Sequence, residues 1–145
     1  QFVRYSEYLK QQDTTRLFLH SPVTQGQNLP KELDAAGNKI ILDQLVRVLA
    51  VSVMAQSAHI TLTAADIDKS YDALIARAGT STDPGEIKTY LHDAFGWDIA
   101  TFKHRVVAPA TLETAVRQEV YKNDAAAFEK ALEEKLKKTV TYIRL

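Results

Sequence analysis

The stretch from residue 83 to residue 107, DPGEIKTYLHDAFGWDIATFKHRVV, most constrains what this chain can fold into. Asp83 is a good N-cap, and the proline after it suits the first position of a helix. Gly96 is typical of a left-handed helix stop, and Asp98 can cap a second helix. The pattern therefore predicts two helices joined by a tight corner. Three aromatic rings are expected to converge on that corner: Phe95, Trp97 and Phe102.

The composition indicates one globular domain. The chain has 145 residues, of which 46% are hydrophobic and 25% charged, enough to build a core. Its net charge is zero, so it lacks the basic surface of a nucleic-acid binder and the basic block that holds proteins on anionic membranes. The absence of cysteine excludes disulfides, thiolate zinc sites and cysteine nucleophiles.

Apolar residues at helical spacing predict further helices before and after the corner. We expect an N-terminal helix over residues 6–19, capped by Ser6, and a second helix from residue 33 or 38 to residue 57. Thr63 and Asp66 form a capping box that opens a third helix. The segment 98–122 resembles one long helix, but Pro109 should kink or break it.

The C-terminal part is expected to be a helix followed by a strand. The helix begins at Asn123 or Asp124, and the tail 139–145, TVTYIRL, alternates as a short β-strand does. The predicted fold is all-α, with about six helices in an irregular bundle and a short C-terminal β-strand. We divide this single domain, residues 1–145, into an N-terminal helix (1–20), a helical core (33–123) and a returning helix with the terminal strand (124–145).

The most apolar run, residues 40–58, predicts a central buried helix. Asp43, Gln44 and Arg47 interrupt it, which argues against a membrane span. Because the chain begins at Gln1, we interpret it as a mature form or an excised piece of a longer protein. Any targeting or anchoring segment would then lie upstream.

No pattern in the sequence predicts catalysis, a metal ion or a cofactor. His92 and His104 flank the corner and could approach each other, but the four histidines lack the spacing of a metal site. The paired carboxylates Asp66/Asp68 and Glu133/Glu134 lie on expected solvent faces of helices, and nothing near them suggests burial that would perturb a pKa for acid–base catalysis. The chain contains no G-x-S-x-G motif and no glycine-rich phosphate loop.

From residue 41 to residue 120 the order of signals resembles a known family. The matching pieces are ILDQLVRVLA, ITLTAADIDKSY and the run GEIKTYL, FGWD, FK and RVVAP, and the opening YSEYL is also similar. This order resembles the N-terminal chaperone domain of SurA-type and PrsA-type parvulin foldases. The resemblance covers most of the chain, and its most specific part is the succession of Asp-Ile-Asp, Tyr-Leu, Phe-Gly-Trp-Asp and Phe-Lys.

The resemblance implies a non-catalytic chaperone that holds unfolded or extended polypeptide in an apolar cleft. It also implies an extracytoplasmic location, periplasmic or at the cell surface, with a membrane anchor outside this chain. Many family members carry a peptidyl-prolyl isomerase domain, but its active-site residues have no matching positions here, so isomerase activity does not carry over. The candidate peptide-binding residues are Tyr90, Phe95, Trp97 and Phe102.

Three alternatives remain open. The rings at the corner also suit plain core packing, which is the simpler interpretation. The chain could instead be an assembly module that forms a homodimer by exchanging its first helix and terminal strand. An isomerase remnant is the third alternative, and the missing domain argues against it.

Overall fold

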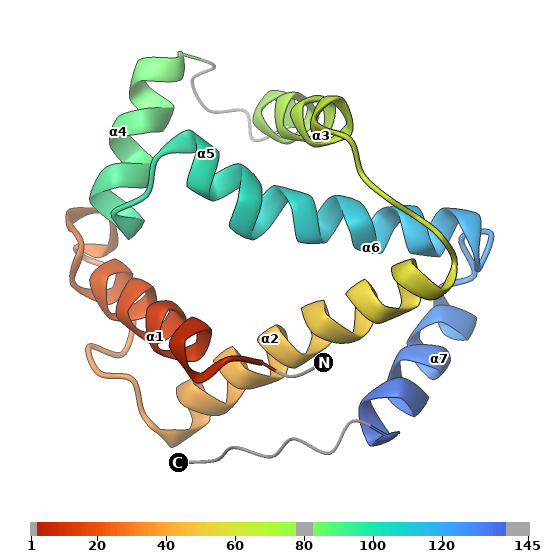
Figure 1. The fold of residues 1–145 in the computed structure, drawn as a ribbon. Coiled ribbons are helices and arrows are strands. Elements are labelled where there is room, and N and C mark those ends of the chain that lie inside the picture. The colour runs from red at the N-terminus through yellow and green to blue at the C-terminus, as the bar shows by residue number, and fades with distance from the viewer. Residues whose placement is uncertain (1–2, 78–82, 139–145) are drawn as a thin grey trace.

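The computed structural model describes residues 3–77 and 83–138, and all regular elements in these ranges are helices (Figure 1). This confirms the all-α prediction for the described residues. The predicted strand at residues 139–145 lies outside them. Six of the helices have twelve or more residues, and the elements in chain order are α1 (Tyr5–His20), η1 (Pro22–Thr24), α2 (Ala35–Ser57), α3 (Ala64–Arg77), α4 (Pro84–Phe95), α5 (Ile99–Phe102), η2 (Lys103–Val107), α6 (Ala108–Glu119) and α7 (Ala125–Lys138).

The helix starts follow local side-chain chemistry, with one correction. Thr63 and Asp66 form the predicted capping box, in which the Thr63 N–H donates to Asp66 Oδ2 at 2.8 Å and the Asp66 N–H donates to Thr63 Oγ1 at 3.2 Å. Asp34 caps α2, which the sequence patterns did not predict. The prediction that Ser6 caps the first helix is wrong, because α1 begins one residue earlier, after Arg4, and has no side-chain cap.

Pro109 changes the long helix without breaking it. The chain remains helical from α5 through η2 to α6, and η2 is a wide π-helical turn in which the Ala108 N–H donates to the Lys103 carbonyl (Figure 1). A proline lacks an N–H and crowds the preceding turn. The π turn absorbs this crowding and leaves Pro109 in the first turn of α6, where a proline is tolerated. The predicted break therefore does not occur, and the helix widens locally instead.

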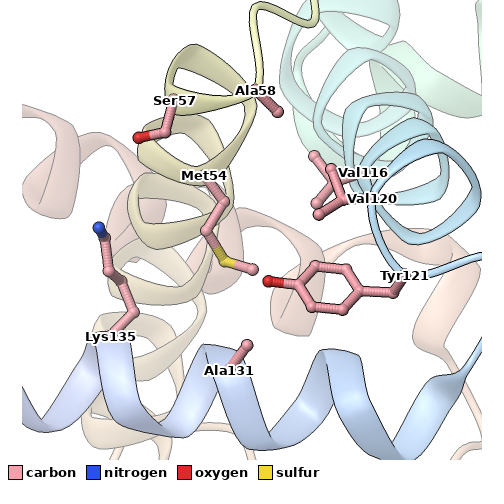
Figure 2. Close-up of a pocket in the computed structure, with 8 residues that line it drawn as sticks. All are labelled: Met54, Ser57, Ala58, Val116, Val120, Tyr121, Ala131 and Lys135. Atoms are coloured by element: carbon pink, nitrogen blue, oxygen red, sulfur yellow. The ribbon is translucent and has the colours of Figure 1, made fainter.

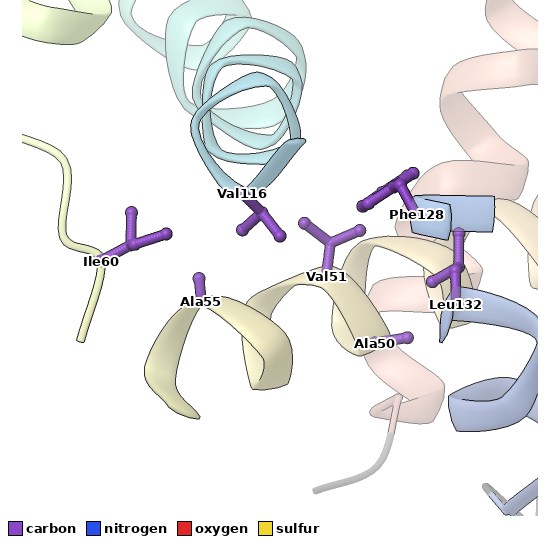
Figure 3. Packing of buried hydrophobic residues seen from close by; sticks show 7 residues of the cluster. All are labelled: Ala50, Val51, Ala55, Ile60, Val116, Phe128 and Leu132. Atoms are coloured by element: carbon purple, nitrogen blue, oxygen red, sulfur yellow. The ribbon is translucent and has the colours of Figure 1, made fainter. Parts of the chain in front are cut away.

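The core lies where α2 meets α6 and α7 (Figure 3). Side chains from all three helices and from the segment after α2 point toward one another there, and Val116, Phe128 and Leu132 are almost completely buried. The cluster consists of Ala50, Val51, Ala55, Ile60, Val116, Phe128 and Leu132.

The apolar helix α2 is central, as predicted, but it is not buried on all sides. It packs against α1, α6 and α7, yet Ile40 and Val48 on its outer side remain 58% and 44% exposed. Within the described residues α2 is the one helix whose length and apolar composition would suit a membrane span, a test that core helices also pass.

The packing of α1 differs from that of the core helices. It lies against α4 and α2, and its one buried residue is polar, Gln12. The Gln12 side-chain amide donates to the Asn38 side-chain oxygen of α2 at 2.5 Å and to the Tyr8 hydroxyl at 3.0 Å. The first helix is therefore held by hydrogen bonds and ring contacts more than by burial of apolar side chains.

Candidate functional site

The corner after α4 forms as the sequence predicts. Gly96 has a φ of +68°, its N–H donates to the His92 carbonyl at 2.8 Å, and the Trp97 N–H donates to the Leu91 carbonyl at 3.2 Å. These two bonds satisfy carbonyls that the helix end would otherwise leave free. Asp98 then caps α5 by accepting a hydrogen bond from a backbone N–H. The turn thus reverses the chain and brings Trp97 back over the end of α4.

Four rings meet at this corner. The ring centroids of Phe18 and Phe95 are 5.1 Å apart and nearly parallel, and those of Phe95 and Trp97 are also 5.1 Å apart. Tyr90 meets Phe95 edge-on at 6.3 Å. We call these four residues, Phe18, Tyr90, Phe95 and Trp97, the aromatic cluster. It joins the end of α1 to the end of α4 and the turn after it.

The aromatic cluster is only partly buried. Tyr90 is 50% exposed, and the other three rings are half-buried. On the same helix Leu91 and Ala94 are buried at 3% and 0% exposure, so α4 has a separate inner face. Leu91 and Ala94 thus pack into the core, whereas the rings of the aromatic cluster keep part of their surface exposed.

The prediction that Phe102 joins this corner is wrong. Its ring meets Tyr71 of α3 edge-on, with the centroids 6.3 Å apart. Lys103 lies over the same tyrosine ring at 4.5 Å and forms an ion pair with Asp68 at 2.8 Å. This hydrogen bond from Lys103 to the Asp68 carboxylate raises the pKa of the lysine. Phe102 and Lys103 thus contact α3 and not the aromatic cluster.

Sequence reasoning missed Phe18, the fourth ring of the cluster. Phe18 lies 77 residues before Phe95 along the chain, and no local pattern links the two. Its one signal is an aromatic residue near the end of an otherwise polar helix, which needs a docking partner.

Arg105 of η2 lies against the aromatic cluster. Its guanidinium carbon is 5.6 Å from the Trp97 ring centroid, a cation–π distance. The guanidinium forms no ion pair or hydrogen bond with a described residue. Its charge acts on Glu7 of α1, whose pKa is lowered first by a hydrogen bond from Lys10 and additionally by Arg105.

A pocket lies at the opposite end, between α2, α6 and α7 (Figure 2). It is a pocket of about 300 Å³, mostly apolar, with the Tyr121 ring and Met54 facing each other across it. The residues that line it are Met54, Ser57, Ala58, Val116, Val120, Tyr121, Ala131 and Lys135. It continues from the core, and the Ser57 hydroxyl at its rim donates to a backbone carbonyl.

Two arginines and two glutamates connect the core helices. Arg47 of α2 contacts Glu113 of α6 and Glu129 of α7, each at 2.9 Å, and Arg117 contacts the same carboxylates at 3.1 and 2.9 Å. The hydrogen bond from Arg47 lowers the pKa of Glu129, and the two carboxylates raise the pKa of Arg47. We call these four residues the ion-pair network. Sequence reasoning took Arg47 only as an interruption of an apolar run.

The predicted titratable candidates do not gather. His92 lies 3.2 Å from its neighbour Asp93, and Asp66 serves as a helix cap. No three side chains suited to hold a metal ion cluster within the described ranges. Comparison of the sequence with protein-family models and curated proteins, and of the structure with solved structures, found no match.

Proposed function

We propose that this domain holds extended or unfolded polypeptide segments at the aromatic cluster, without catalysis. The observation that carries the proposal is the incomplete burial of four contacting rings from two helices and a turn. Partly exposed aromatic groups that lie together are typical of surfaces that bind other chains. Exposed aromatic residues that are scattered singly over a surface are normal and would not support this proposal.

The surroundings of the cluster suit apolar segments of variable sequence. Leu17, which is 45% exposed, lies directly against Gly96 of the turn. It extends the apolar surface beside the rings. Such a surface favours weak binding that tolerates many sequences, because ring and aliphatic contacts do not need hydrogen-bond geometry.

The resemblance to the chaperone domain of SurA-type and PrsA-type foldases supports the same proposal. Trp97 and Phe95 belong to the most specific part of that resemblance. The extracytoplasmic location and the upstream anchor remain proposals that rest on the resemblance alone.

The test is suppression of aggregation. A denatured model protein is diluted into buffer with and without the domain, and light scattering is followed. We expect the wild type to lower the scattering and Trp97→Ala to lose most of this effect. Tyr90→Ala is the second variant, because its exposed ring contributes little to folding. No suppression by the wild type would contradict the proposal.

Phe102→Ala is the matched control. It removes an aromatic ring from the same stretch of sequence, but from the side that faces Tyr71. We expect this variant to keep its holding activity at a temperature where circular dichroism shows it folded. Equal losses in Phe102→Ala and Trp97→Ala would mean that the effect comes from general destabilisation.

A second candidate function is homodimer assembly by exchange of α1, together with the strand that the sequence predicts for residues 139–145. The observation that favours it is the weak docking of α1, whose one buried residue is Gln12 and whose Tyr5 and Leu9 are 53% and 38% exposed. A helix that is held this weakly can leave its own chain and dock at the same place on a partner chain. Light scattering coupled to size exclusion over a wide concentration range tests this, and a constant monomer mass contradicts it.

A further inference from the structure

The guanidinium of Arg105 forms no ion pair or hydrogen bond within the described residues. The π turn η2 places its guanidinium over Trp97, and the side chain is half-buried. Glu7, a carboxylate on which Arg105 acts electrostatically, is paired with Lys10 at 3.0 Å. The guanidinium therefore has hydrogen-bond donors that no described residue accepts.

In the core, the arginines that lie over an aromatic ring are also paired with carboxylates. Arg47 and Arg117 lie 5.9 and 4.6 Å from the Phe128 ring centroid, and both are neutralised by the carboxylates of the ion-pair network. Arg105 has the same ring contact but lacks the carboxylate. Charge complementarity therefore favours an acidic partner for Arg105.

We propose that Arg105 and the aromatic cluster together select polypeptide segments in which an aspartate or glutamate side chain lies two residues from an aromatic residue. This inference rests on the function proposed above and names the preferred client class. In an extended chain, residues i and i+2 point to the same side, about 7 Å apart. The Arg105 guanidinium carbon lies 5.6 Å from the Trp97 ring centroid, and the Phe95 centroid lies 5.1 Å from that of Trp97. The spacing in the client chain therefore suits a carboxylate at Arg105 and an aromatic ring at the aromatic cluster.

The planar guanidinium decides the chemistry of the selected group. Its fork of N–H groups matches the two oxygens of a carboxylate, whereas a lysine ammonium offers a point charge. The guanidinium carbon of Arg105 lies 5.6 Å from the Trp97 ring centroid, and no described residue accepts a hydrogen bond from the guanidinium. We therefore expect the preference for acidic segments to depend on arginine and not on positive charge alone.

The test uses two capped peptides that differ in one atom group. Both contain a phenylalanine, and two residues later one has glutamate and the other glutamine. Trp97 is the sole tryptophan of the chain, so its fluorescence reports binding next to Arg105. We expect the glutamate peptide to bind the wild type about fivefold more tightly, as is typical of a well-oriented exposed ion pair. High salt should reduce this preference.

Three variants locate the preference. Arg105→Gln should bind both peptides equally, and Arg105→Lys should keep only part of the difference. Lys103→Gln is the matched control, because this second cation of η2 is paired with Asp68 and lies over Tyr71. It should keep the full preference of the wild type.

The possible outcomes separate the two proposals. Equal binding of both peptides by the wild type would overturn the acidic preference and leave polypeptide binding intact. Binding of neither peptide would count against both proposals at this surface. A glutamine peptide with a free C-terminal carboxylate is the third probe. If it binds as tightly as the glutamate peptide, the site recognises chain ends, and the inference about side chains is wrong.

Discussion

The two ends of this molecule use the same interactions for different outcomes. At the α2, α6 and α7 end, Phe128 is 0% exposed, two arginines lie over its ring, and glutamates neutralise those arginines. At the α1 and α4 end, Trp97 contacts Phe95 as closely as rings pack in cores, but the rings are half-buried and Arg105 over Trp97 has no carboxylate partner.

The comparison teaches that completeness of packing, more than the type of contact, separates a stabilising cluster from a binding surface. Burial of apolar area contributes to the free energy of folding in proportion to the area removed from water, so half-buried rings contribute less than a completely buried one. Where burial and charge pairing are left incomplete, the same groups remain available to a partner. We therefore expect substitutions at the core end to change stability most, and substitutions at the aromatic cluster to change binding most.

The largest effect is expected for Phe128→Ala. Removing a completely buried ring leaves a cavity and should lower the free energy of unfolding by about 3–5 kcal/mol. Urea denaturation followed by circular dichroism measures this. Tyr90→Ala, at a ring that is 50% exposed, should cost less than about 1 kcal/mol. Similar losses in the two variants would contradict the proposed division of the molecule.

A smaller effect is expected for Gly96→Ala at the other end. An alanine there must adopt a positive φ, and its Cβ would lie 2.9 Å from Leu17 Cδ2. We expect a loss of about 2 kcal/mol, because the left-handed conformation alone costs roughly 1–2 kcal/mol. Trp97 emission should also shift.

Gly26→Ala is the matched control for the glycine substitution. Gly26 has a φ of +80°, but a Cβ there meets no atom within 4 Å. It should therefore lose only the backbone contribution and leave Trp97 emission unchanged. Equal losses of stability at the two glycines would show that contact with Leu17 has no part in the effect.

The smallest effect is expected for Arg47→Gln in the ion-pair network. Its side chain is 35% exposed and those of Glu113 and Glu129 are 25% and 47% exposed, so solvent screens the charges and the loss should be about 1 kcal/mol at neutral pH. Arg105→Gln, which breaks no ion pair within the described residues, should cost less than about 0.5 kcal/mol. Thermal unfolding of both variants measures the difference.

The pH dependence of stability tests the ion-pair network at the core end. The pKa of Glu129 is lower in the folded state, chiefly through the hydrogen bond from Arg47, so its contribution is complete above the unfolded pKa and is lost as the pH falls through the folded pKa. The wild type should therefore lose stability between about pH 5 and about pH 3, and Arg47→Gln should lose less over the same interval. Parallel pH profiles of the two proteins would contradict this role of the network.

Local sequence was enough to predict three of the helix caps and the turn at the corner. Asp83, Asp98 and the Thr63–Asp66 pair cap helices as expected, and Gly96 ends α4 with a positive φ. Each of these features depends on groups within a few residues, so their side-chain chemistry decides them. The peptide-binding role of Tyr90, Phe95 and Trp97 stays a prediction.

Contacts between distant residues were not predictable in the same way. Glu113 and Glu129 look like ordinary surface charges in the sequence, and only the packing of α2 against α6 and α7 brings Arg47 to them. Pro109 predicted a break, whereas the long helix widens into the π turn that carries Arg105.

The sequence by itself determined where α3, α4 and α5 begin and that the chain turns sharply at Gly96, because these features depend on nearby backbone and side-chain groups. Only the tertiary structure decided which rings meet. Phe18 reaches Phe95 because α1 docks on α4, and Phe102 leaves the corner because its helix packs on α3. The physical reason is that partners far apart in sequence are selected by the fit of whole helix faces, a property of the assembled fold.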